Sequence, residues 1–229
     1  MFDKVKFGAA AILFRKNGKR TNADVFRHIY EKDLWNETPG GGMKLCSGKG
    51  SDEEYALPYA ALIREFMTKN QICSVVDLGC GDFRVASQFA FHCEKYIGID
   101  CVEELVKYNA QTYGNDKVRF MCLDIVKDEL PDGELCLIRQ VLQHLSNADI
   151  ECVLHQCSKY SYVIVTEHLL NELRQKPNMD KVRGLHTRLF FGSGVYLDKE
   201  PFRYMAEKLL EIPYDEKSHL EIHLIKNSR

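Results

Sequence analysis

Between residues 72 and 165 the chain alternates short apolar runs with helical segments, and this alternation restricts its fold more than any other feature. Strands that alternate with helices of such lengths form a parallel sheet with helices on both of its faces. The sequence therefore predicts an α/β fold built on a doubly wound, mostly parallel sheet. The predicted strands are 72–78, 96–99, 118–123, 135–138 and 162–165, and the predicted helices are 85–92, 102–112 and 146–157.

The end of the chain has a different pattern. Apolar residues at helical spacing predict a helix over residues 202–210. Two apolar runs, 210–213 and 220–225, then flank a polar segment that predicts a turn. Two strands joined in this way form a hairpin, so we expect a C-terminal antiparallel strand at the edge of the parallel sheet.

The first part of the chain is expected to cover the rest. Helical spacing predicts a helix over residues 22–35, and one proline with five glycines predicts a loop over 38–50. Ser51 begins an S-x-x-E capping box, which predicts the start of a second helix. We therefore expect residues 1–70 to form a helical cap or lid and residues 71–229 to form the ligand-binding domain.

Charge and cysteine content exclude several classes of protein. The chain has 31 basic and 33 acidic residues, a net charge of -2, which argues against a dedicated nucleic-acid binder. Its nine cysteines form no C-x-x-C pair, so we expect reduced thiols and a cytoplasmic location. Cys152, His155 and Cys157 cannot point at one ion from a single helix, and no bound metal is expected. No apolar stretch reaches the ~20 residues that a membrane span requires.

A tight turn rich in glycine follows the first predicted strand. Asp77 is the second-last residue of that strand, and Gly79 and Gly81 follow the strand in the run D-L-G-C-G-D. Glycines allow a sharp turn and a close approach of the backbone to a ligand. In open α/β sheets, ligands lie beyond the carboxyl ends of the strands, beside such a turn. The sequence therefore predicts the ligand site at this turn.

The acidic residues around the turn indicate the kind of ligand. Asp100 ends the next predicted strand, 19 residues after Gly81 (100 minus 81), and a carboxylate at about this spacing holds ribose hydroxyls. The dinucleotide pattern G-x-G-x-x-G requires a third glycine, where this chain has Arg84. Asp77 and Asp82 would repel a pyrophosphate and attract a ligand with a sulfonium and an ammonium group. These residues favour S-adenosyl-L-methionine over a nicotinamide dinucleotide.

Three segments resemble the class I S-adenosylmethionine-dependent methyltransferases: Asp77 to Gly81, Gly98 to Asp100, and Leu123 with Asp124. The resemblance extends over residues 70–226, including the final hairpin. It implies a Rossmann-like fold and S-adenosyl-L-methionine as the cofactor, with the acid at 100 on the ribose and the acid at 124 on the adenine edge. The residues expected to bind the cofactor are Asp77, Gly79, Cys80, Gly81, Asp100, Cys101, Asp124, Ile125 and Gln140.

Weaker resemblances indicate the acceptor of the methyl group. Residues 140–145 resemble the x-V-L-x-H-L segment of small-molecule methyltransferases. More loosely, residues 35–51 and 178–202 resemble bacterial methyltransferases found with surface-polysaccharide genes. The expected acceptor is an oxygen of a saccharide or nucleotide-linked metabolite of surface-polysaccharide synthesis. A protein- or RNA-directed methyltransferase is the nearest alternative, followed by a nicotinamide-dependent oxidoreductase and a non-catalytic module.

Three residues near the ends of the fourth and fifth predicted strands are candidate general bases. His144 lies six residues past Ile138 (144 minus 138), and an ordinary histidine pKa of about 6.5 suits a base at neutral pH. Glu167 and His168 are expected just after the fifth strand, as a carboxylate beside an imidazole. A base that removes the proton of a hydroxyl acceptor accelerates transfer by about a hundred- to ten-thousandfold. The sequence does not decide among the three.

Two loops are expected to contact the acceptor. The loop 40–51 contributes Ser47 and Lys49, and Trp35 precedes it. The long segment 168–202 is expected to close over the acceptor pocket. His186 and Arg188 are its candidate contacts, and Arg188 together with Arg183 and Lys181 has the charge to clamp a phosphate or a carboxylate.

Overall fold

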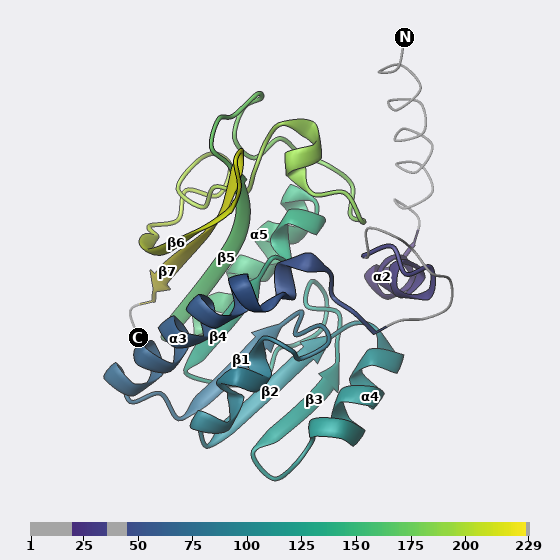
Figure 1. Ribbon diagram of the computed structural model, residues 1–229, viewed down its shortest axis with the longest axis vertical. Helices are drawn as coiled ribbons and strands as arrows, with labels where there is room; N and C mark the ends of the chain where they lie inside the picture. The colour runs from purple at the N-terminus through teal and green to yellow at the C-terminus, as the bar shows by residue number, and fades with distance from the viewer. Residues whose placement is uncertain (1–19, 36–44, 228–229) are drawn as a thin grey trace.

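The computed structural model of the protein describes residues 20–35 and 45–227. Within them a seven-stranded sheet has the order β3-β2-β1-β4-β5-β7-β6 (Figure 1). Strands β1 to β5 run parallel, and β7 is antiparallel to both of its neighbours. The predicted doubly wound sheet with a C-terminal antiparallel hairpin is confirmed. The strands are β1 Ser74–Leu78, β2 Lys95–Asp100, β3 Val118–Cys122, β4 Leu135–Arg139, β5 Tyr162–Leu170, β6 Glu207–Asp215 and β7 Ser218–Lys226.

Helices lie on both faces of this sheet. Successive residues of a strand point to opposite faces, so Val75 packs in one apolar cluster with α3 and Val76 packs in another with α5. Figure 1 shows α3 crossing in front of the central strands and α5 behind them. The α-helices are α2 Asn22–Glu31, α3 Glu53–Lys69, α4 Glu103–Tyr113 and α5 Asn147–Gln156, and the short 3₁₀ turns are η1 Lys49–Ser51, η2 Ala86–Gln88, η3 Ala90–His92, η4 Leu142–His144, η5 Cys157–Lys159 and η6 Arg188–Phe191.

Two helices predicted from apolar spacing are absent. Residues 85–92 form the turns η2 and η3, because the buried rings of Phe83 and Phe89 both pack on Tyr96 and fix the chain between them. Residues 202–210 are not helical either. Their second half begins β6, which pairs with β7 from residue 207 onward, and this ladder satisfies the backbone groups that a helix would have paired internally.

The start of α3 also differs from the prediction. Ser51 belongs to the turn η1, and α3 begins after Asp52, whose side chain makes no capping hydrogen bond. Asp52 instead lies 3.6 Å from the guanidinium of Arg84. The predicted capping box is therefore wrong, because the short turn before the helix moves its start past Ser51.

Strand β5 is longer than predicted, and this changes the placement of two candidate residues. It continues to Leu170 because β7 pairs with all nine of its residues. Glu167 and His168 consequently lie inside a strand, where neighbouring side chains point to opposite faces. The expectation that they follow the strand as one pair is wrong.

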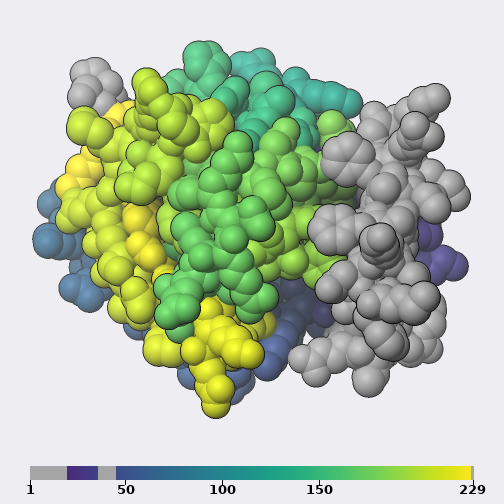
Figure 2. All heavy atoms as spheres, turned by 90° about the horizontal axis from the view of Figure 1, so that it is seen from above, coloured from purple at the N-terminus to yellow at the C-terminus, as the bar shows by residue number. Residues whose placement is uncertain are grey.

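Several loops and the helix α2 lie at the carboxyl edge of the sheet. The loops between β5 and β6, residues 171–206, form much of the face seen from above (Figure 2).

Residues 38–44 of the predicted loop 38–50 lie outside the described residues. In the part of the chain that is described, no helix is both long and apolar enough to cross a membrane.

Candidate functional site

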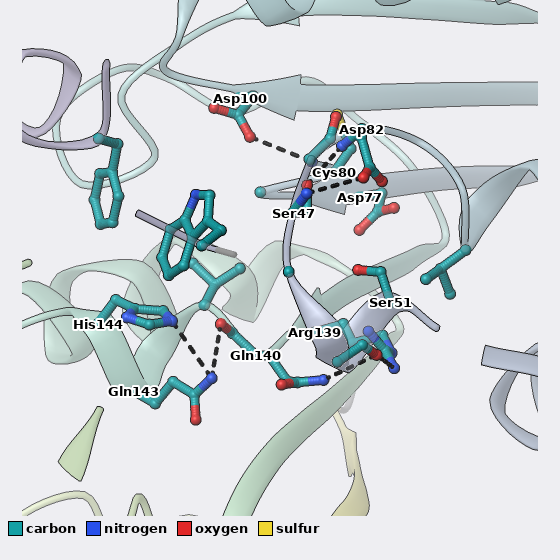
Figure 3. A pocket seen from close by; sticks show the side chains of 18 of the residues that line it. Ser47, Ser51, Asp77, Cys80, Asp82, Asp100, Arg139, Gln140, Gln143 and His144 are labelled. Atoms are coloured by element: carbon teal, nitrogen blue, oxygen red, sulfur yellow. Dashed lines mark hydrogen bonds between the residues drawn. The ribbon is translucent and has the colours of Figure 1, made fainter. Parts of the chain in front are cut away.

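A cavity of about 370 Å³ opens at the carboxyl ends of β1, β2 and β4. Asp77, Asp100 and Arg139 stand at the ends of these strands, and all three line it (Figure 3). A parallel sheet brings such strand ends to one edge, which is why residues distant in sequence meet here. Every residue predicted to bind a cofactor lines this cavity: Asp77, Gly79, Cys80, Gly81, Asp100, Cys101, Asp124, Ile125 and Gln140.

The glycine turn is held in a conformation that favours glycine. Gly79 and Gly81 have φ angles of 74° and 56°, which side chains rarely adopt. A side chain at Gly81 would also run into the hydroxyl of Ser47. The amides of Gly79 and Cys80 both donate to the carbonyl of Ile99, at 2.8 and 2.9 Å. The turn is therefore tied to β2 and lies open to the cavity.

Asp100 is oriented by the backbone around it. Its two carboxylate oxygens accept from the amides of Gly81, at 3.3 Å, and Val102, at 3.1 Å. The residue is 9% exposed, and burial raises the pKa of its carboxyl to about 6 even though these amides favour the charged form. It is ionised at neutral pH and can accept hydrogen bonds from a ligand in the cavity.

Two further acids, Asp77 and Asp124, also line the cavity. Asp77 accepts a hydrogen bond of 2.6 Å from the hydroxyl of Tyr96, and burial raises its pKa to about 6. Asp124 accepts a hydrogen bond of 2.7 Å from the side-chain amide of Asn22 in α2. This contact joins the first described helix to the end of β3, and sequence reasoning missed it because 102 positions separate the two residues.

The segment 45–51 is fastened to the glycine turn. The amide of Ser47 donates to Asp82 at 2.9 Å, and its hydroxyl accepts from the amide of Asp82 at 2.8 Å. The hydroxyl of Tyr30 lies 3.1 Å from the same hydroxyl. Asp82 also holds Arg84 at 2.8 Å. Ser47 therefore lines the cavity as part of a fixed wall.

His144 lines the cavity as a neutral imidazole. Its Nδ1 lies 3.1 Å from the carbonyl oxygen of Gly184, so this nitrogen carries the proton and donates it. The other nitrogen, Nε2, is left as an acceptor 3.4 Å from the side-chain amide nitrogen of Gln143. Burial and the nearby ammonium of Lys181 lower the pKa of His144 to about 3. Such a group accepts hydrogen bonds but is a weak proton acceptor at neutral pH.

Glu167 does not line the cavity. Its carboxylate is buried and accepts from the amides of Leu142 and Gln143, both at 3.0 Å. Burial raises its pKa to about 8, and the guanidinium of Arg188 opposes that shift. Glu167 therefore does not reach a ligand in the cavity, which contradicts a direct catalytic role. It instead holds the turn η4, which carries His144.

His168 points to the other side of β5 and lines the cavity. Its Nε2 donates to the hydroxyl of Ser218 at 2.8 Å, because that hydroxyl gives its own proton to Asp215 at 2.7 Å. Its ring lies 4.1 Å from the ring of Tyr214, centroid to centroid. Burial lowers its pKa to about 4, so it too is neutral at neutral pH, with Nδ1 as the acceptor.

The basic residues of the segment 168–202 that are expected to clamp the acceptor instead bind other parts of the protein. Arg188 is fully buried and donates to the carbonyls of Met179, Leu142 and Leu145 and to the side chain of Asn147. The prediction that it contacts the acceptor is wrong, because its donors already have partners away from the cavity.

The neighbours of Arg188 are engaged in the same way. Lys181 donates to the carbonyl of His144 at 3.1 Å, and Arg183 pairs with Asp149 at 3.4 Å. His186 stacks on Phe190, with ring centroids 4.6 Å apart, and does not line the cavity. The loop contributes two other residues to the cavity wall, Leu185 and Thr187.

The remaining predicted acceptor contacts do line the cavity. Trp35 packs edge-on against His144, with ring centroids 4.9 Å apart. Lys49 extends over the ring of Tyr214, 5.6 Å from its centroid. Sequence reasoning missed Tyr214, Tyr59 and Arg139, which form the wall near Lys49. Of these, Arg139 had a usable signal, since it directly follows an apolar strand whose end faces the ligand.

Acids, histidines and cysteines line this cavity, but within the described part of the chain no three of them bring ligand atoms close enough together to hold one ion. Among the described residues one group, Glu211, His219 and Glu221, has ligand atoms within 4.8 Å of one another, and it lies on the hairpin β6–β7. Cys152 is exposed, whereas Cys157 is buried with its sulfur 3.7 Å from that of Cys136. All nine cysteines are free thiols.

Comparisons with known proteins agree with this geometry. Residues 75–161 match the family described as a methyltransferase domain. The chain is 34% identical over 83 residues to phosphoethanolamine N-methyltransferase 1 of Arabidopsis thaliana, which is 34% of this chain and 17% of that protein. The chain thus spans about a sixth of the length of the curated relative.

Solved structures share the fold. The N-methyltransferase NodS of Bradyrhizobium japonicum, in complex with S-adenosyl-L-homocysteine, has a TM-score of 0.56 at 12% identity, over 78% of this chain and 89% of that one. The magnesium protoporphyrin IX methyltransferase of Synechocystis, with S-adenosylmethionine bound, has a TM-score of 0.58 at 16% identity, over 93% and 100%. Residues 75–161 therefore match a methyltransferase domain, within a chain that has the fold of class I S-adenosylmethionine-dependent methyltransferases.

Proposed function

We propose that this protein binds S-adenosyl-L-methionine and transfers its methyl group to an oxygen of a small molecule. The observation that carries the proposal is that Asp100 and the turn from Gly79 to Gly81 face one cavity. An ionised carboxylate there accepts hydrogen bonds from ribose hydroxyls, and the open glycine turn lets a methionyl chain approach the backbone. Asp77 and Asp82 would favour the positive charge of the cofactor.

The acceptor would lie on the side of the cavity formed by Trp35, Gln143 and His144. The indole Nε1 of Trp35 and the side-chain oxygen of Gln143 are buried and have no hydrogen-bond partner among the described residues. Buried polar atoms of this kind are normally satisfied, so a bound acceptor would supply the partners. Methyl transfer depends on alignment of donor and acceptor, which can contribute up to about 7–11 kcal/mol.

The size and cover of the cavity favour a small acceptor. The whole cavity of about 370 Å³ is within the range of small-molecule sites, and the cofactor and the acceptor would share it. The helix α2 and the segment 45–51 line it together with the strand ends, which supports a covering role for these parts of the cap expected over residues 1–70, whereas α3 packs on the sheet of the domain 71–229. We propose a saccharide or a nucleotide-linked metabolite of surface-polysaccharide synthesis as the acceptor, because aromatic rings with polar atoms line this side.

The two histidines limit the kind of atom that is methylated. Both His144 and His168 are neutral, with pKa values lowered by burial to about 3 and about 4. They can orient an acceptor but assist proton removal weakly, so a phosphate oxygen, which needs no proton removed, fits better than an ordinary hydroxyl. A nitrogen acceptor is the second candidate, since a neutral amine also brings its own lone pair, and the curated relative is named an N-methyltransferase.

Two measurements test the proposal. Calorimetry with S-adenosyl-L-homocysteine should show binding that the variant Asp100→Asn weakens, while Asp116→Asn, at an exposed site outside the cavity, should bind as the wild type does. An assay for released S-adenosyl-L-homocysteine over a panel of sugar phosphates, nucleotide sugars and amines should then identify the acceptor.

Three results would contradict the proposal. Binding of a nicotinamide dinucleotide without binding of the adenosyl cofactor would place the protein among oxidoreductases. Transfer only to protein or RNA would exclude a small-molecule acceptor. Cofactor binding with no turnover on any acceptor would favour a non-catalytic module.

A further inference from the structure

Arg139 places a positive charge in the wall of the cavity that no carboxylate of the described residues neutralises by an ion pair. One terminal nitrogen, Nη2, donates to the carbonyl of Gly50 at 2.6 Å. The guanidinium carbon lies 5.1 Å from the centre of the Tyr59 ring. The Nε atom is buried and has no partner within the described part of the chain. The side chain thus has donor capacity left over at the cavity.

A buried guanidinium without a counter-ion is costly. Arginine keeps its charge in proteins, and a buried charge is normally paired or fully hydrogen-bonded because its desolvation is expensive. Carboxylate and phosphate groups match the planar fork of a guanidinium and form strong charge-assisted hydrogen bonds with it. A ligand anion beside Arg139 would supply the missing partner.

A second cation lies at the same end of the cavity. Lys49 lines it with its ammonium over the ring of Tyr214. The acids Asp100 and Asp124 line it as well, at the ends of β2 and β3. Because the strand order is β3-β2-β1-β4, the acidic strand ends and the cationic end of β4 stand on opposite sides of the glycine turn. The cations therefore lie on the β4 side of the glycine turn, where Asp77 and Asp82 attract Arg139 without forming an ion pair with it.

We propose that Arg139, assisted by Lys49, binds a carboxylate or phosphate group of the small molecule that occupies the cavity. This inference rests on the proposed function. The anion has two sources: the methionine carboxylate of the cofactor and an acidic group of the acceptor. If the cofactor supplies the anion, its methionine part has a short distance to span. The strand β4, which carries Arg139, is two strand spacings, about 10 Å, from β2, which carries the ribose-facing acid Asp100.

The first arm of the test compares two nucleosides by calorimetry. S-adenosyl-L-homocysteine carries the amino-acid carboxylate, whereas 5′-methylthioadenosine keeps the adenine, ribose and thioether without it. If the cofactor is the source, Arg139→Gln weakens binding of the first by about ten- to a hundredfold and leaves the second unchanged. Arg139→Lys, which keeps a positive charge, should recover part of the loss.

The second arm tests the acceptor as the source. With S-adenosyl-L-homocysteine saturating, inorganic phosphate should raise the thermal midpoint of the wild type, and Arg139→Gln and Lys49→Gln should reduce that shift. Inorganic phosphate is the simplest probe for an acidic acceptor group. A response in either arm supports the anion subsite and names its source.

A control separates charge from loosening of the wall, because Arg139 also holds Gly50. The variant Ser47→Ala removes one of the two hydrogen bonds between the segment 45–51 and Asp82 but leaves Arg139 intact, so it should weaken both nucleosides alike. Equal losses of both nucleosides in Arg139→Gln, or no change in either arm, would overturn the subsite. A wild-type chain that binds neither nucleoside would instead refute the proposed function, and the subsite with it.

Discussion

Ser47 and Asp82 exchange two hydrogen bonds across 35 positions of the chain, and this reciprocal pair holds the cavity wall against the glycine turn. Each residue uses its side chain to satisfy the backbone amide of the other, which an isolated loop cannot do. The pair also lies against Gly81, where an added Cβ atom would meet the hydroxyl of Ser47. Loop, turn and cavity wall are therefore one connected unit.

Ser47→Ala should weaken cofactor binding without unfolding the sheet. The variant removes one acceptor of a net value of about 1 kcal/mol, so we expect the dissociation constant of S-adenosyl-L-homocysteine to rise about fivefold and the thermal midpoint to change little. Ser87→Ala is the matched control, because its hydroxyl bonds only the nearby carbonyl of Arg84 and does not line the cavity. Equal affinities of Ser47→Ala and the wild type would show that the pair does not shape the site.

Arg188→Ala should lower stability rather than acceptor binding. The change leaves the carbonyls of Leu142 and Leu145 without donors in a buried site, and each unsatisfied group costs about 1–3 kcal/mol. We expect a clear fall in the midpoint of urea unfolding. Arg183→Ala removes a partly exposed ion pair and should change it by less than about 1 kcal/mol. Normal stability of Arg188→Ala with a raised KM for the acceptor would reverse this assignment.

The strand pattern made most of the sheet and its ligand edge predictable. Apolar runs that lead into Asp77 and Asp100 mark both the strand and the place where it meets the cavity, so local sequence is enough. Apolar spacing alone did not separate helix from other structure at 85–92 and 202–210. There the aromatic cluster around Phe83 and the partner strand β7 decide the conformation, and both are tertiary.

Burial explains the errors at the site. Arg188 lies in a polar, glycine-rich loop, and only the folded chain shows that backbone carbonyls surround its guanidinium. The side chains of Glu167 and His168 point to opposite faces because β5 continues through both residues. The strand is this long because it pairs with β7. Arg139 belongs to no familiar motif, and only its place at the end of β4 indicates that it faces the cavity.

The two cavity histidines should differ in their effect on transfer. Removing His144 deletes an imidazole that lies beside Gln143 and Trp35 and can orient the acceptor, so His144→Ala should lower kcat for the acceptor identified by the panel by about tenfold or more through lost alignment. His168→Ala should raise KM instead, since His168 lies by Tyr214 at the cationic end. Binding of S-adenosyl-L-homocysteine should survive both changes. A larger kcat loss in His168→Ala would exchange the two roles.

Cofactor affinity should fall as the solution is acidified through about pH 6. Burial raises the pKa of Asp100 and of Asp77 to about 6, so below that pH both carboxyls gain a proton, and the cavity loses negative charge and hydrogen-bond acceptors. The same shifts reverse the sign for stability. A carboxyl whose pKa is higher in the folded chain favours folding at low pH, and this contribution is lost as pH rises from about 4 to about 6. Calorimetry with S-adenosyl-L-homocysteine from about pH 8 to about pH 5 should therefore show weaker binding while unfolding experiments show no parallel loss from these two groups. Asp100→Asn should bind weakly and with less dependence on pH. An affinity that stays constant through about pH 6 would show that neither acid contacts the cofactor in its ionised form.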